Sequence, residues 1–187
     1  MGFWKLLRNA KNKLVFREYG KNVYIAPNVI IKRPQLVSIG NHVTVQRNAS
    51  FYIHPSNKNS TSCILRLGNY VHIGLNNVIS AVNSIIIEDY VLIAPNVTIV
   101  DSSHKYEDIE IPIIFQAYTR GGTVHIEREC WIGTNVIILP NVTIGRHSII
   151  GANSVVKQSI PPFSIAAGAP ARVIRKYDVD KKKWVRV

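Results

Sequence analysis

The sequence predicts an all-β fold in which short strands coil into a parallel β-helix, and three observations support this prediction. The first is a run of aliphatic residues spaced six apart: Ile126, Ile132, Ile138, Ile144, Ile150 and Val156. A period of six matches neither an α-helix nor the simple alternation of a strand. It is the period of solenoids in which every short strand forms one side of a three-sided coil.

The second observation is the type of residue between these aliphatic positions. Gly133, Gly145 and Gly151 directly follow an aliphatic residue, where the chain must turn a corner. Small side chains stand where the inside of a corner must be filled: Val136, Val142, Ser148 and Ser154. The third observation is that the same spacing continues upstream, through Ile39, Val45 and Phe51, then Leu67, Ile73 and Ile79, then Ile87, Ile93 and Ile99. We expect all these aliphatic side chains to share one core.

Interruptions of the repeat predict how the chain is organised. The repeats slip between residues 79 and 87 and are broken at residues 55–62 and, most extensively, at residues 101–123. Loops longer than about 12–15 residues in a compact domain are usually functional or disordered. We expect an N-terminal segment, 1–22, to cover the open end of the coil, and a β-helix over 23–174 to carry a protruding arm at 101–123. A basic C-terminal tail, 175–187, is expected to be helical or loose.

Composition limits the class of protein. A chain of 187 residues with 47% hydrophobic residues is long enough for one domain with a sizeable core. Cys63 and Cys130 lie far apart without CxxC spacing, which argues against a disulfide framework or a zinc ribbon and favours a reducing compartment. The sequence contains no apolar run long enough for a transmembrane helix, and we do not expect its basic N-terminus to act as a signal peptide, because it lacks an uninterrupted apolar region. We therefore expect a cytoplasmic protein.

The charge balance suggests anionic ligands. The formal net charge is +12, from 23 basic and 11 acidic residues, and part of the excess lies at the two ends of the chain. Such a field attracts nucleic acid, an anionic membrane face or phosphorylated small molecules. Aromatic residues do not alternate with basic ones as they would on a stacking platform, so nucleic acid is not expected as a partner. The N-terminal segment is basic and amphipathic, so it permits peripheral contact of the protein with the anionic inner face of a membrane.

A combination of motifs in the second half of the chain resembles the hexapeptide-repeat acyltransferases. The motifs are LIAPNVTI, then a histidine, an arm ending just before CWIG, and a closing SIAAGAPARVI. The chain is most similar to the sugar and polysaccharide O-acetyltransferase branch, which includes galactoside and maltose acetyltransferases and capsule or O-antigen enzymes. The resemblance implies a left-handed β-helix, although parallel crossovers are usually right-handed. It also implies a homotrimer that binds acetyl-coenzyme A in the groove between subunits.

The same resemblance implies roles for individual residues. The catalytic histidine of the family falls on His104, and a histidine side chain can accept a proton near neutral pH. For the cofactor, the resemblance implies that Trp131 lies beside the pantetheine arm and that backbone groups near Thr134 and Ala152 hold it. Arg172 and Arg175 are implied to contact the nucleotide phosphates. Lys157 is a further basic candidate, shifted by one position from the family pattern. Asp101 and Tyr118, both in the arm, are candidates for acceptor binding.

These assignments predict direct transfer of an acetyl group to a sugar hydroxyl of a saccharide or polysaccharide precursor. A thioester is already activated, so a base and an oxyanion site suffice, and neither a covalent acyl-enzyme nor a metal is required. One alternative is N-acetylation of a nucleotide-linked amino sugar, which the positive charge suits equally well. A second is a zinc enzyme with three shared histidines, but the six histidines have no pair closer than twelve residues. A third is a non-catalytic scaffold.

Overall fold

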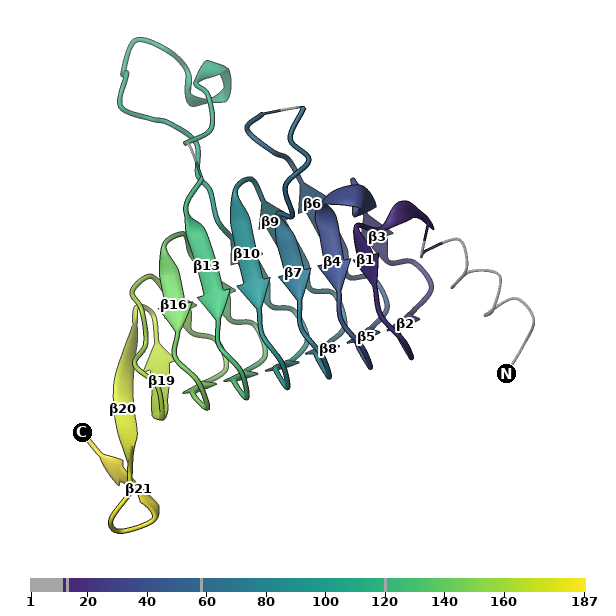
Figure 1. The fold of residues 1–187 in the computed structure, drawn as a ribbon. Helices are drawn as coiled ribbons and strands as arrows, with labels where there is room; N and C mark the ends of the chain where they lie inside the picture. Colours follow the sequence, from purple (N-terminus) through teal and green to yellow (C-terminus); the bar gives the residue numbers. More distant parts are fainter. Residues whose placement is uncertain (1–11, 13, 58, 120) are drawn as a thin grey trace.

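The strands lie in three sheets that form the three sides of a coil (Figure 1). The computed structural model describes residues 12, 14–57, 59–119 and 121–187, so most of the predicted N-terminal cap lies outside the described residues. Side A contains β1 (Glu18–Tyr19), β4 (Val37–Ile39), β7 (Leu65–Leu67), β10 (Ser84–Ile87), β13 (Thr123–Ile126) and β16 (Val142–Ile144). Side B contains β2 (Tyr24–Ile25), β5 (Thr44–Val45), β8 (His72–Ile73), β11 (Leu92–Ile93), β14 (Trp131–Ile132), β17 (Ile149–Ile150) and β19 (Ser164–Gly168). Side C contains β3 (Ile30–Ile31), β6 (Ser50–Ile53), β9 (Val78–Ala81), β12 (Thr98–Val100), β15 (Ile137–Ile138) and β18 (Val155–Val156). The predicted left-handed parallel β-helix is confirmed.

The core consists of three aliphatic columns, one for each side. The columns are Ile39, Leu67, Ile87, Ile126 and Ile144 on side A, Val45, Ile73, Ile93, Ile132 and Ile150 on side B, and Phe51, Ile79, Ile99, Ile138 and Val156 on side C. Each of these side chains is at most 2% exposed. Adjacent strands lie about 4.8 Å apart, so each ring of three aliphatic residues packs directly on the next. The spacing of six therefore identifies the core correctly.

The coil begins earlier than residue 23. Tyr19, Ile25 and Ile31 continue the spacing of six, and they stand in register with Ile39, Val45 and Phe51 of the next coil. The predicted boundary between the cap and the β-helix is therefore wrong, and β1 already belongs to side A. The first ring is harder to detect in the sequence because one of its members is a tyrosine, and all three residues are only partly buried against the core.

The C-terminal tail is also different from the prediction. It is neither helical nor loose, because β20 (Ala171–Asp178) pairs antiparallel with β19, and β21 (Lys183–Arg186) pairs antiparallel with β20. Tyr177 and Trp184 pack edge to face across this hairpin, with ring centroids 5.4 Å apart. The hairpin continues side B past the last coil (Figure 1). An unpaired sheet edge favours such pairing, which local sequence does not reveal.

The corners between sides B and C have a conformation that explains a second repeat. The corner asparagines Asn28, Asn48, Asn76, Asn96, Asn135 and Asn153 all have φ between 58° and 62°. Asparagine tolerates this left-handed conformation better than most residues. Side-chain amides also bond between successive coils, as from Asn76 Nδ2 to Asn96 Oδ1 at 3.1 Å. Gly133 turns one such corner, where a Cβ atom would lie 2.7 Å from the backbone nitrogen of Ala152.

Asp101 holds the corner at which the arm begins. Its carboxylate is fully buried and accepts three backbone hydrogen bonds of 2.8 Å, from Val82 to Oδ1 and from Asn83 and Ser84 to Oδ2. Burial raises the pKa of this carboxyl group above its ordinary value, and the backbone N–H donors oppose the rise. The residue therefore fixes one coil to the base of the arm.

The outward faces of the three sides differ in polarity. Side A carries charged residues, with Arg66 3.8 Å from Glu18 and His125 2.7 Å from Glu88. Large apolar residues are exposed on the other two sides, Leu92 and Trp131 on side B and Ile30 and Ile137 on side C. Sides B and C are therefore the faces suited to contact another protein surface.

Replacement of Ile87 by alanine should lower the free energy of unfolding by about 2–5 kcal/mol, because it leaves a cavity inside a fully buried column. Ile86 is the matched control. It lies on the same strand but points outward and is only half-buried, so Ile86→Ala should lower the free energy by about 1 kcal/mol or less. Urea unfolding at one protein concentration measures both, and equal losses would contradict the inward column.

Replacement of Asp101 by asparagine should destabilise the fold by about 1–3 kcal/mol, because an NH₂ group would then face backbone N–H donors. Asp89→Asn is the control. Asp89 accepts a bond from the backbone of Asn69 in a column that already contains asparagines, so its replacement should be tolerated. Thermal unfolding of the two variants distinguishes these outcomes, and a stable Asp101→Asn protein would refute the structural role.

Candidate functional site

The arm between β12 and β13 is closed at its neck by His104 and Tyr118. These residues form an isolated antiparallel bridge, and their ring centroids lie 4.3 Å apart. Two backbone bonds flank the bridge, from Lys105 N to Ala117 O at 2.9 Å and from Thr119 N to Ser103 O at 2.7 Å. His104 itself is exposed to solvent. The neck therefore presents an accessible imidazole beside a phenol on a defined backbone frame.

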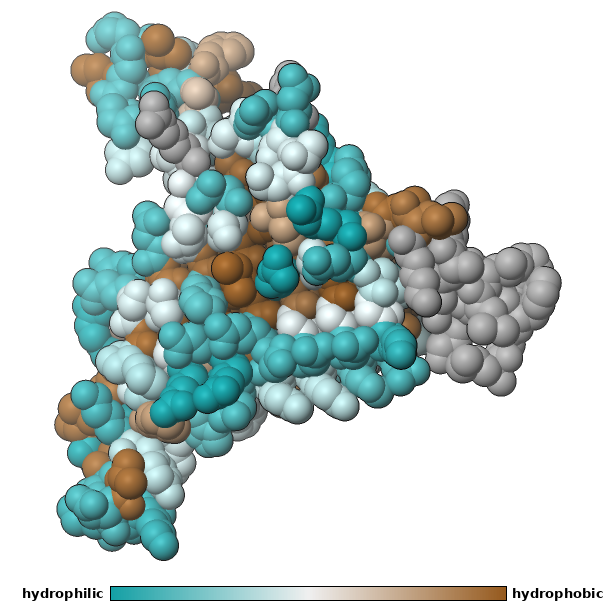
Figure 2. All heavy atoms as spheres, in the orientation of Figure 1, coloured by the Kyte–Doolittle hydropathy of each residue, from teal (hydrophilic) through white to brown (hydrophobic). Residues whose placement is uncertain are grey.

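The tip of the arm is apolar and exposed. Ile109, Ile113, Ile114 and Phe115 are 91%, 56%, 79% and 78% exposed, and the last three form the short 3-10 helix η2 (Ile113–Phe115). Figure 2 shows brown, hydrophobic atoms on the arm, which stands out from the coil. Such a cluster on a projecting segment marks a contact surface.

Asp101 is not positioned to bind an acceptor, contrary to the prediction. Its carboxylate is occupied by the three backbone amides described above, and it is 0% exposed. No contact between this carboxylate and the His104 ring is found in the described part of the chain. Tyr118, by contrast, is 56% exposed, and its ring lies tilted against that of His104, where it can contact a bound molecule.

A cavity of about 450 Å³ adjoins the neck of the arm. Its lining residues come from several segments of the chain: Arg33, His54, Pro55, Ser56, Val82, Ala117, Tyr118 and Thr119. Tyr118 is common to this cavity and to the His104 contact. Sequence reasoning missed Arg33 and His54, and the only available signal was the break in the repeat that follows His54.

The predicted cofactor residues on side B lie in one row. Trp131 stands in register with Ile149, Ile149 with Ile165, and Ile165 with Arg175. Trp131 is 49% exposed, and the row spans three strand spacings, or about 14 Å. Among the described residues, Arg175 has no ion-pair partner. The arrangement is an apolar strip with an unpaired guanidinium at one end.

Two further groups of predicted residues lie close to this strip. Thr134 and Ala152 occupy the same corner on successive coils, where the carbonyl of Thr134 accepts a bond of 2.9 Å from the backbone of Asn153. Arg172 donates a bond of 3.4 Å to Gln158, the residue that follows Lys157. The chain segment that contains Lys157 therefore lies next to Arg172.

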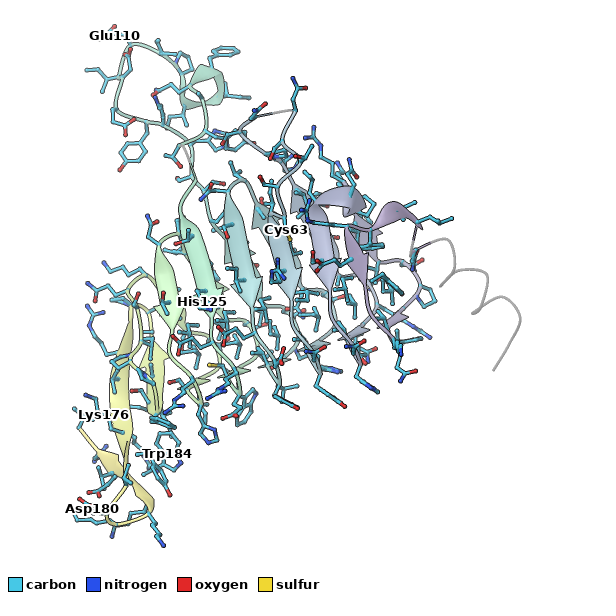
Figure 3. All side chains as sticks on the ribbon, in the orientation of Figure 1. Cys63, Glu110, His125, Lys176, Asp180 and Trp184 are labelled. Atoms are coloured by element: carbon cyan, nitrogen blue, oxygen red, sulfur yellow. The ribbon has the colours of Figure 1, made fainter. Side chains whose placement is uncertain are left out.

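Within one chain, His104 does not join the predicted cofactor residues. Thr134 precedes side C at one corner, whereas His104 follows side C at the opposite corner, and β12 and β15 lie between them. In Figure 3, Glu110 on the arm lies near the top of the view, and Lys176 on the C-terminal hairpin lies well below it. A site that uses both groups needs a second copy of the chain.

Other reactive groups are less favourable for catalysis. Cys130 is buried, and burial raises the pKa of its thiol to about 11, so a thiolate nucleophile is not available there. Within the described ranges, no group of three His, Cys, Asp or Glu side chains is arranged to hold a metal ion. None of the helices in the part of the chain that the structure describes is long and apolar enough to cross a membrane.

Comparison with known proteins agrees with this architecture. The family model described as bacterial transferase hexapeptide (six repeats) matches residues 123–158. The probable acetyltransferase Rv3034c of Mycobacterium tuberculosis is 39% identical over 127 residues, which is 66% of this chain and 42% of that protein. Galactoside O-acetyltransferase of Escherichia coli K12 is 39% identical over 131 residues, which is 64% of this chain and 61% of that protein. The chain thus spans less than two thirds of the length of either relative.

A solved structure extends the similarity over nearly the whole chain. It is a point mutant of AntD, an N-acyltransferase from Bacillus cereus, in complex with dTDP and coenzyme A. The sequences are 25% identical, the TM-score is 0.74, and the superposition covers 93% of this chain and 89% of that one. Residues 123–158 of this chain thus match a hexapeptide-repeat transferase model, and its three-sided coil is similar over nearly its whole length to that of a known acyltransferase.

Proposed function

We propose that the chain transfers an acetyl group from acetyl-coenzyme A to a hydroxyl group of a sugar or glycan precursor. The observation that carries this proposal is the row on side B, an exposed tryptophan and two isoleucines that end at the unpaired guanidinium of Arg175. The similarity to a galactoside O-acetyltransferase supports the choice of a sugar hydroxyl as acceptor.

The row fits the shape and polarity of coenzyme A. The pantetheine arm is long, narrow and partly apolar, so it can lie over Trp131, Ile149 and Ile165. Its amides can bond to backbone groups at the corner of Thr134 and Ala152. Arg175, with Arg172 and Lys157 nearby, offers cationic groups for the phosphates.

In the proposed mechanism, His104 acts as a general base. It accepts the proton of the acceptor hydroxyl while the hydroxyl oxygen attacks the thioester carbonyl. The new C–O bond forms, the C–S bond breaks, and His104 returns the proton to the departing thiolate. A positioned base of this kind contributes about 10²–10⁴-fold to the rate. No acyl-enzyme is required, in keeping with the buried thiol of Cys130.

We propose further that the chain is a homotrimer with each site shared between two subunits. The apolar faces of sides B and C then pack against each other between neighbours, and charged side A faces solvent. The arm of one subunit crosses to side B of the next and brings its His104 to the neighbour's Trp131. In the same arrangement, the exposed apolar tip of the arm packs against the neighbouring subunit. Closed cyclic assemblies with such repeated contacts are common among soluble oligomers.

N-acylation of a nucleotide-linked amino sugar is a second candidate. Its specific support is the structural similarity to AntD, which was solved with dTDP and coenzyme A. The net charge of +12 would also favour a diphosphate-bearing acceptor. Because an amine is a better nucleophile than a hydroxyl group, this reaction would depend less on His104.

Replacement of His104 by alanine should lower kcat by about 10²–10⁴-fold and leave coenzyme A binding intact. His147→Ala is the control, since His147 is exposed and pairs with Glu129 outside the proposed site. Thiol release from acetyl-coenzyme A against sugars, nucleotide sugars and lipid-linked glycans measures activity, and calorimetry measures binding. Undiminished turnover would place the base elsewhere and favour an amine acceptor. Absence of coenzyme A binding would refute the function and leave a scaffold.

Co-expression of His104→Ala with Trp131→Ala chains tests the shared site. In random trimers, about a quarter of the sites combine an intact His104 from one subunit with an intact Trp131 from the next. We therefore expect the mixture to recover about a quarter of wild-type activity, although each variant alone is nearly inactive. Co-expressed chains that stay as inactive as the separate variants would mean that both residues act within one chain.

A further inference from the structure

The cavity at the neck of the arm has a cationic wall that the proposed chemistry does not use. Four segments meet there: the corner after β3 provides Arg33, the stretch after β6 provides His54, the corner after β9 provides Val82, and the neck of the arm provides Tyr118. The volume of about 450 Å³ falls in the usual range for small-molecule sites. Since Tyr118 also contacts His104, a molecule in this cavity would lie beside the proposed base.

Arg33 stands out by its lack of partners. Its side chain is half-buried, and no hydrogen bond or ion pair to it is found among the described residues. A guanidinium group removed from water normally gains such partners, because an unpaired buried charge is unfavourable. The group is therefore available to an anionic ligand in the cavity.

Arg33 occupies a left-handed corner position, as residues of several types do at other corners of the coil, but here a proline follows. Its φ of 54° and ψ of 58° lie in the left-handed region, directly before Pro34. A residue before proline prefers an extended conformation, and non-glycine residues rarely adopt a left-handed one. The corner after β15 places Asn141 in the left-handed region instead, at φ 63°.

A second cationic group, the ammonium of Lys32, lies near the cavity. His54 stacks on Tyr52 with ring centroids 6.2 Å apart, and the Lys32 ammonium group lies 5.3 Å from the centre of the same ring. None of the described residues that line the cavity is acidic. The carboxylate of Asp101 lies behind the cavity wall at Val82, where it is buried and accepts hydrogen bonds from the backbone N–H groups of residues 82–84. A guanidinium fork in such a setting matches the paired oxygens of a phosphate.

We propose that this cavity binds a phosphate group of the acceptor through Arg33, with the sugar directed toward His104. The acceptor is then a sugar carried on a phosphate, either a nucleoside diphosphate sugar or a sugar on a lipid phosphate. This inference rests on the proposed acetyl transfer for its role in catalysis, but the binding of phosphate can be measured without any transfer.

The test uses the full chain with Arg33→Asn and, as a matched control, Lys32→Gln. Asparagine suits the left-handed backbone, so Arg33→Asn removes the guanidinium without adding strain and should keep or raise the Tm. Lys32→Gln removes the same charge one residue away, outside the cavity lining. The ligands are UDP, dTDP, inorganic pyrophosphate and uncharged glucose, each titrated by calorimetry without coenzyme A.

We expect the wild-type protein to bind the diphosphates and not glucose. Arg33→Asn should raise Kd by roughly 10-fold to 100-fold, and Lys32→Gln by less than about threefold. Tighter binding of UDP or dTDP than of pyrophosphate would identify a nucleotide sugar, whereas equal binding would identify the phosphate group alone and a lipid-linked acceptor. In turnover, Arg33→Asn should raise KM for the phosphorylated sugar and leave kcat nearly unchanged.

Either of two binding results would overturn the proposal. One is the failure of the wild-type protein to bind any of the phosphate probes, and the other is equal weakening by the two variants, which would indicate only a diffuse positive field. Acetylation of unphosphorylated sugars that is indifferent to Arg33 would also refute it, while leaving the acetyltransferase function intact. Phosphate binding through Arg33 without any acetyl transfer would instead refute the proposed function and keep the site.

Discussion

The stacking of inward-pointing aliphatic residues is the constraint on which the rest of the structure depends. Each side of each coil contributes one such residue to a column, and the columns remain continuous because the core residues of successive sides within a coil, such as Ile126, Ile132 and Ile138, stand six apart. A slip of one residue would turn an aliphatic side chain outward and a polar one inward. The corners must therefore turn in a fixed number of residues, which explains the left-handed asparagines and the close approach at Gly133.

A coil built in this way leaves little freedom for chemistry, so function is expected where the repeat is broken. The arm carries His104 and Tyr118, and the stretch after β6 closes a cavity beside them. Arg33 adopts a conformation in which the B–C corners place asparagine, and it does so beside that cavity. A rigid scaffold that positions irregular loops is a common basis for binding sites.

The outward faces of the three sides differ in polarity, and this difference suits them to different contacts. Charged pairs such as His125 with Glu88 cover side A, whereas side B exposes Trp131 and side C exposes Ile137. One chain separates His104 from the row that ends at Arg175, because side C lies between them. Assembly and catalysis are therefore linked in the proposed enzyme, since the contact that covers the apolar faces also completes the site.

The sequence by itself determined the β-helix, its aliphatic columns and the position of the arm, because these follow from spacing along the chain. It also indicated His104, Trp131 and Arg175 through motifs that a family shares. Only the tertiary structure showed that the coil begins at Tyr19, that residues after 170 form a hairpin on side B, and that Asp101 is a buried corner residue. Only the tertiary structure likewise showed that Arg33 and His54 line the same cavity. The physical reason is that periodicity is a local property, whereas a free sheet edge, a desolvated carboxylate or a cavity wall depends on segments that meet only after the chain has coiled.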